Sequence, residues 1–77
     1  MSLSNLINVV VRTGEQGYYV AECLEVNIVT QGITLDALIK NLKEAVELFF
    51  EDENPADFGF SDKPHLSIKM EIEPEYA

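Results

Sequence analysis

Residues 29–50 read VTQGITLDALIKNLKEAVELFF, and this stretch decides the fold of the 77-residue chain. Its β-branched start followed by Gly32 is typical of a strand that ends in a turn. Thr34 stands where a helix N-cap is expected, and Asp36 follows where a negative charge meets the positive end of the helix dipole. The stretch therefore predicts a short strand and then a helix.

The predicted helix has one apolar and one charged side. Its apolar residues recur every three or four positions: Leu35, Leu38, Ile39, Leu42, Ala45, Val46, Phe49 and Phe50. The other side carries Asp36, Lys40, Lys43, Glu44, Glu47 and Glu51. Asn54 and Pro55 are expected to end the helix, because proline cannot continue it.

Three short strands are predicted before the helix. The run LSNLINVVVRT (3–13) is rich in β-branched residues and apolar on both faces, which indicates a central strand. The turn GEQG (14–17) leads into a second strand over 18–24, as in a hairpin. After a weak turn signal at 25–27, VNIVTQ (26–31) is expected to pair as the third strand.

One strand is predicted after the helix. Residues 54–64, NPADFGFSDKP, read as a turn-rich loop, and HLSIKMEIE (65–73) then alternates between apolar and polar residues. The apolar positions are Leu66, Ile68, Met70 and Ile72, which we expect to face the helix. The fold class is α+β: a two-layer βββαβ domain, with a mixed sheet of order 3-2-1-4 and one helix on one face.

The opposite sheet face then lacks a cover, although it carries apolar or aromatic residues, with Tyr18 and Tyr19 adjacent in the second strand. A core this small contributes only about 3 to 5 kcal/mol. We therefore expect this face or an edge strand to be buried by association, which predicts a homo-oligomer or a complex.

Length and charge limit the function. The chain is expected to form a single domain over residues 1–77. Fourteen acidic and five basic residues give a net charge of −9, which disfavours direct nucleic-acid binding and favours a basic protein partner. No apolar run suits a membrane span, and one cysteine cannot form an internal disulfide. A cytoplasmic protein without a cofactor or metal is expected.

No catalytic constellation stands out. A two-metal nuclease needs a carboxylate on the central strand, where this chain has Asn5 and Asn8. His65 has no second histidine, cysteine or serine near it in sequence, and Cys23 is expected to be a buried, inert thiol. The GEQG turn lacks the lysine of a phosphate loop. We therefore expect no enzyme activity, with a metal-dependent nuclease as a weaker alternative.

Three segments, GYYVAEC (17–23), VTQGIT (29–34) and LDALIKNLKEAVELFFED (35–52), together resemble the HicB antitoxin family, the partners of HicA-type mRNA interferases. The resemblance implies a truncated ribonuclease-H-like fold that inhibits a small basic toxin by covering its active surface, without catalysis. Many HicB proteins carry an additional DNA-binding domain at the C-terminus, and none is expected here.

Candidate partner-binding residues follow from charge and aromatic character. The acids at the end of the helix, together with Glu71, Glu73 and Glu75, are suited to steer a basic toxin. Phe58 and Phe60 are either partner anchors or part of the domain's own packing. The full set of candidates is Tyr18, Tyr19, Glu51, Asp52, Glu53, Asp57, Phe58 and Phe60. The alternative function is that of an orphan homo-oligomeric domain with no toxin.

Overall fold

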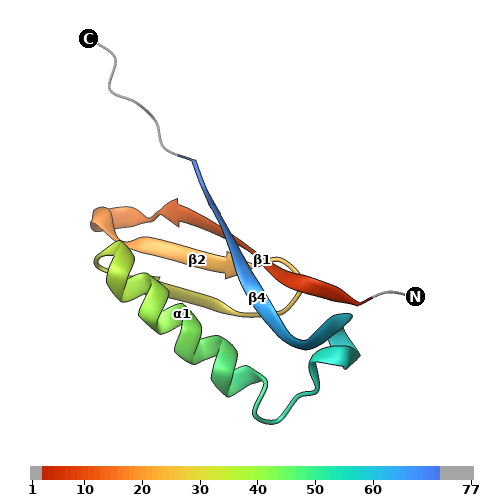
Figure 1. Ribbon diagram of the computed structural model, residues 1–77. Coiled ribbons are helices and arrows are strands. Elements are labelled where there is room, and N and C mark those ends of the chain that lie inside the picture. The colour runs from red at the N-terminus through yellow and green to blue at the C-terminus, as the bar shows by residue number, and fades with distance from the viewer. Residues whose placement is uncertain (1–2, 72–77) are drawn as a thin grey trace.

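The computed structural model describes residues 3–71, which form a four-stranded sheet with one long helix packed on it (Figure 1). The strands are β1 (Ser4–Thr13), β2 (Tyr19–Cys23), β3 (Val29–Gly32) and β4 (Phe60–Met70), and the helix is α1 (Leu35–Phe49). Two short 3₁₀ turns, η1 (Glu15–Gly17) and η2 (Pro55–Phe58), complete the described chain. The strand order β3-β2-β1-β4 confirms the predicted α+β fold and its 3-2-1-4 sheet.

The sheet is mixed because β4 runs parallel to β1, whereas the other neighbouring strands run antiparallel. Antiparallel pairing joins β1 to β2, with Val11 opposite Ala21, and β2 to β3. Parallel pairing joins β1 to β4, with Val9 opposite Ile68. A parallel pair needs a long crossover connection, which α1 and η2 supply. The β-branched run of β1 is thus paired on both sides, as its two apolar faces predicted.

The start of α1 follows the predicted cap. The hydroxyl of Thr34 accepts a hydrogen bond from the backbone N–H of Ala37 at 3.0 Å, and Asp36 lies in the first turn. Just before it, Gly32 is buried where β3 meets the helix. A Cβ at this position would lie 2.5 Å from the backbone nitrogen of Leu38. Only glycine lets β3 and α1 approach this closely.

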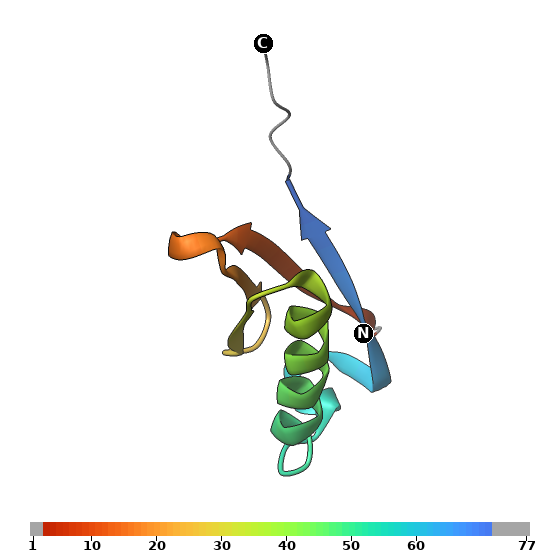
Figure 2. The same ribbon diagram turned by 90° about the vertical axis from the view of Figure 1, so that its left-hand side faces the viewer.

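The core lies between α1 and the inner face of the sheet. Its buried members are Ile7, Val9, Val11, Ala21, Cys23, Val26, Ile28, Leu38, Leu42 and Phe60. Leu66 and Met70 of β4 are half-buried against this cluster. Ile68 was expected there too, but 42% of its surface is exposed. The reason is that α1 packs against β3 and β2 and leaves the inner side of β4 open (Figure 2).

Two strands start three or more residues from the predicted position. β3 starts at Val29 rather than at Val26, and Val26 and Ile28 are instead buried in the connection before it. β4 starts at Phe60, inside the segment predicted as a loop. Phe60 is buried there, and it pairs with Ser4 of β1. The expected core position Ile72 lies outside the described residues.

Candidate functional site

An acidic end follows helix α1. We define it as Glu51, Asp52, Glu53 and Asp57, whose side chains are all exposed. No basic residue lies in the last turn of α1, so nothing in that turn offsets these charges. Negative charges at a helix C-terminus cost about a few tenths of a kcal/mol each, because they face the negative end of the dipole. A cationic partner would offset this local repulsion.

The acidic end has a fixed scaffold. The side chain of Asn54 accepts a hydrogen bond from the N–H of Ala56 at 3.1 Å, which starts the turn η2 at Pro55. Gly59 then closes η2 with a positive φ of 85°, a conformation that glycine adopts without strain. The turn that carries Asp57 is therefore held in one conformation beside the end of α1.

Aromatic side chains anchor the same end from inside. The ring of Phe58 lies 5.2 Å from that of Phe49 and 6.1 Å from that of Phe50, both at edge-on angles. Phe50 also meets Phe60 at 6.3 Å. Phe60 is only 1% exposed, so it is not an accessible partner anchor, and Phe58 is half-buried against the core. Both aromatics pack onto their own domain, the second of the two roles considered from the sequence.

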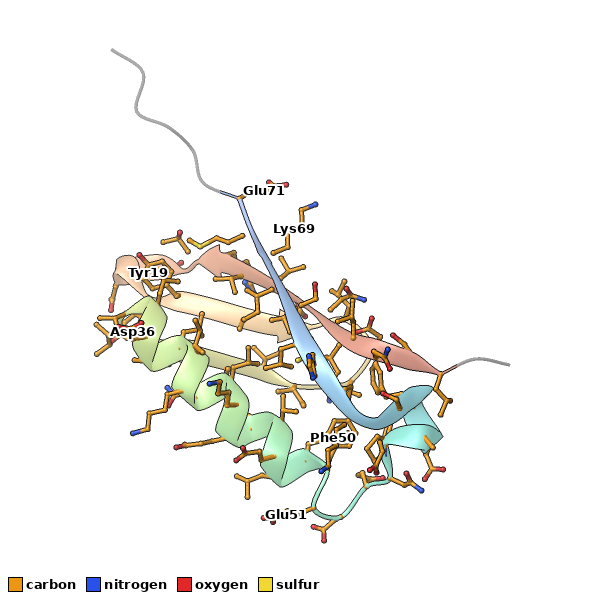
Figure 3. All side chains as sticks on the ribbon, in the orientation of Figure 1. Tyr19, Asp36, Phe50, Glu51, Lys69 and Glu71 are labelled. Carbon is orange, nitrogen blue, oxygen red and sulfur yellow. The ribbon has the colours of Figure 1, made fainter. Side chains whose placement is uncertain are left out.

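The other predicted acids do not join this end. Glu71 is exposed just after β4, and Figure 3 shows it at the opposite end of the molecule from Glu51. Glu73 and Glu75 lie outside the described residues. The acids named from the sequence therefore do not form one continuous patch, and the four residues from 51 to 57 are the group that the fold brings together.

The tyrosine pair divides between two environments. Tyr19 lies on the helix side of the sheet, in register with Gly32, and packs against the core. Tyr18 is half-buried directly after η1, and its N–H donates to the carbonyl of Glu15 at 3.4 Å. Tyr19 therefore supports the core, and only Tyr18 remains beside the uncovered side of the hairpin.

The sheet side without a helix carries an apolar surface that the candidate residues did not include. We call it the open face, and its exposed apolar members are Leu6, Val10, Leu24 and Val29. Strand register places Val10 between Glu22 of β2 and Lys69 of β4. The sequence of β1 indicates this surface, because successive strand residues face opposite sides of the sheet. Leu6 and Val10 alternate with the buried Ile7, Val9 and Val11 and therefore lie on the open face.

A groove runs between α1 and the inner side of β4. Its volume is about 520 Å³, and its lining consists of Ile39, Lys43, Val46, Glu47, Pro64, His65, Leu66 and Ile68. The groove exists because α1 covers β2 and β3 and leaves β4 free. His65 borders this groove, and its register with Leu6 places it on the open face of the sheet.

The end of β2 is held by a carboxylate that the sequence did not single out. Glu25 accepts two hydrogen bonds from Asn8, one from the backbone N–H at 2.9 Å and one from the side-chain amide at 2.6 Å. The next N–H, of Leu24, donates to the carbonyl of Asn8 at 2.9 Å. Asn8 therefore has a structural role at the edge of the β1–β2 pairing.

Burial, and next the charge of Glu25, raise the pKa of the Cys23 thiol above its usual value. This thiol lies in the core with 5% of its surface exposed. Within residues 3–71, no group of three or more His, Cys, Asp or Glu side chains is arranged to hold a metal ion. No helix in the same range is long and apolar enough to cross a membrane.

Comparison with known proteins finds a relative of similar length. The chain is 32% identical over 72 residues to the UPF0150 protein of Helicobacter pylori (strain J99), covering 94% of this chain and 99% of the relative. No protein-family model matches the chain. No solved structure matches it either.

Proposed function

This chain belongs to the UPF0150 family, and from that premise we propose that it is a HicB-like antitoxin, a non-catalytic protein that neutralises a small basic mRNA interferase of the HicA type. The proposal takes its direction from the resemblance of VTQGIT and the following helix to HicB proteins. In this chain the motif has a structural role: Gly32 allows the close approach of β3 to α1, and Thr34 caps the start of α1.

The acidic end is the observation that carries the proposal. Four exposed carboxylates lie within the seven residues from Glu51 to Asp57, and Phe58 of η2 packs on Phe49 at the end of α1. Such a cluster attracts a basic protein over a distance of about one Debye length, roughly 8 to 10 Å at physiological salt. An inhibitor that acts by covering its target gains most from fast association, which complementary charge provides.

The absence of catalysis belongs to the same proposal. The central strand β1 places Asn8 where a nuclease of this topology would need a carboxylate, and the amide of Asn8 is already bonded to Glu25. We expect the purified protein to leave RNA intact over a magnesium titration. RNA cleavage by the purified chain alone would contradict the proposal.

The experiment that tests the proposal measures association with a HicA-type toxin from the same host. The test variant neutralises the acidic end with Glu51→Gln, Asp52→Asn, Glu53→Gln and Asp57→Asn. We expect a slower on-rate, by about tenfold at low salt, and a weaker dependence of that rate on salt, because steering of this kind raises on-rates by 10-fold or more.

A matched control neutralises four exposed acids elsewhere: Glu15→Gln, Glu44→Gln, Glu47→Gln and Asp62→Asn. Both variants change the net charge by +4, so a difference between them reports the position of the charge. Equal on-rates for the two variants would show that the acidic end has no special role. Lack of any binding to the toxin would contradict the antitoxin proposal itself.

The alternative, an orphan homo-oligomeric domain without a toxin, is favoured by the exposed apolar side chains of the open face, of which Leu24 is 62% and Val29 is 58% exposed. Mass measurement of the complex isolated from the native host distinguishes the two functions. A heteromeric mass that includes a short basic protein supports the antitoxin.

A further inference from the structure

Strand β4 presents a long outer edge. It spans 11 residues, from Phe60 to Met70, and among the described strands it pairs only with β1. Figure 2 shows β4 at one side of the sheet, and the strand order places β1 between it and the other two strands. An edge of this length leaves a row of backbone N–H and C=O groups free to pair with another strand.

We propose that a second copy of this chain pairs with the edge, β4 against β4 in antiparallel orientation, with the twofold axis at Ser67. Opposite residues in an antiparallel pair have side chains on the same face. Around Ser67, each residue at position 67 + n therefore lies opposite the residue at position 67 − n of the second copy.

On the open face this register is complementary in charge. Glu71 lies opposite Lys63 of the second copy, and the twofold axis repeats this pair at the other end of the interface. Lys69 lies opposite His65, and Ser67 meets its own counterpart. Lys63, Lys69 and Glu71 are all exposed in the single chain, so their charges are free to pair. Each cross-strand pair of opposite charge stabilises such a ladder.

On the helix side the same register places apolar groups together. Ile68 lies opposite Leu66 of the second copy, and Met70 lies opposite Pro64. Ile68 is 42% exposed in the single chain, because α1 does not reach β4. Leu66, Met70 and Pro64 are each partly exposed. Pairing the two strands would bury these side chains along one continuous row.

Neighbouring registers are worse. With the axis at Leu66, Lys63 would lie opposite Lys69 of the second copy at both ends, and like charges in this position are destabilising. With the axis at Ile68, Lys69 would face Ser67, and Lys63 would face position 73, which lies outside the described residues. Among the registers whose charged pairs all lie within residues 3–71, charge complementarity favours the axis at Ser67. The dimer does not depend on the proposed toxin binding, because none of the residues that pair between positions 63 and 71 belongs to the acidic end.

A cysteine at the axis tests the register directly. Opposite Cα atoms in an antiparallel pair are about 4.5 or 5.5 Å apart, within the range that a disulfide spans. Under oxidising conditions Ser67→Cys is expected to form a covalent dimer. Lys69→Cys is the control, because its two copies would be about 14 Å apart and too far to bridge. The native Cys23 is buried, so the unmodified chain serves as a blank.

A charge exchange tests the same dimer without covalent chemistry. Glu71→Lys would place two lysines opposite each other at both ends and weaken dimerisation by about tenfold. Adding Lys63→Glu to it restores the opposite charges and is expected to restore the affinity. Glu44→Lys makes the same change of charge on the helix and should leave the dimer intact.

Analytical ultracentrifugation measures these affinities. A monomeric mass for the unmodified protein up to about 1 mM, where even weak association is detected, would overturn the proposal. Equal cross-linking of Ser67→Cys and Lys69→Cys, or failure of the double exchange to restore the dimer, would overturn the register.

Discussion

Gly32 shows why one residue in the deciding stretch tolerates no replacement. Its φ is not in the positive range, so the need for glycine here is a matter of space. A methyl group would lie 2.5 Å from the nitrogen and 2.7 Å from the Cα of Leu38, and these are backbone atoms that cannot turn away. The chain could accept a side chain only by moving α1 off β3.

We therefore expect Gly32→Ala to lower the free energy of unfolding by about 1 to 3 kcal/mol, in the range of overpacking substitutions. Gly14→Ala is the comparison, because its nearest neighbour is the end of the Val20 side chain at 3.1 Å, which can shift. Urea denaturation of the two variants measures the difference. A loss at Gly32 no larger than that at Gly14 would contradict the close approach of β3 and α1.

Cys23 links stability to pH at the same scale. Burial, followed by the charge of Glu25, raises the pKa of the thiol in the folded protein. The folded state therefore retains the proton at a pH where the unfolded thiol, with a pKa of about 8.5, has lost it. The contribution of this group to stability is fully present below that pH and is lost as the pH rises through the folded pKa.

The expected result is a fall in the free energy of unfolding above about pH 8.5 that is shallower in Cys23→Ala than in the unmodified protein. The variant is less stable overall because it leaves a small cavity, so the slope against pH is the quantity to compare. Parallel slopes for the two proteins between pH 8 and pH 10 would show that the thiol is not shielded in the folded state.

At the scale of elements, the helix was the easiest part to predict and the last strand the hardest. The apolar spacing and the Thr34 cap are local signals, and the structure confirms both. The start of β4 is decided by distant contacts, since Phe60 is buried, packs on Phe50 just after α1 and is paired with β1. Residues 60–64 contain proline and polar residues that locally resemble a loop, so only tertiary packing makes them a strand.

Side-chain truncations on β4 should show that its first residue is part of the core and that its middle is not. Phe60→Ala is expected to cost about 3 to 5 kcal/mol, because it empties a fully buried site. Ile68→Ala in the monomer should cost clearly less, because Ile68 is largely exposed beside the groove. Thermal or urea unfolding at concentrations below that of self-association measures both. Similar losses at the two positions would mean that α1 reaches β4 in solution.

At the scale of the whole molecule, the sequence predicted the strand order but not the grouping of surface residues. The order follows from element sequence and the right-handed crossover, which leave few alternatives for a chain this short. The grouping of surface residues depends on which strands α1 covers. Because it packs on β2 and β3, Ile68 of β4 stays exposed and the groove between α1 and β4 stays open. The separation of Glu71 from Glu51 likewise depends on the length of β4, which sequence pattern underestimated (Figure 3).

Parallel pairing of β1 with β4 has a practical consequence for attaching the protein to a support. Leu3 and Ser4 lie beside η2, where the N–H of Ser4 donates to the carbonyl of Gly59 at 2.9 Å, whereas β4 leaves the sheet at the other end. A biotin or fluorophore attached at Ser4 would lie next to the end of η2, the turn that carries Asp57, and would crowd a protein that approaches there. The same label attached after β4 would hold the molecule with the acidic end facing the solution.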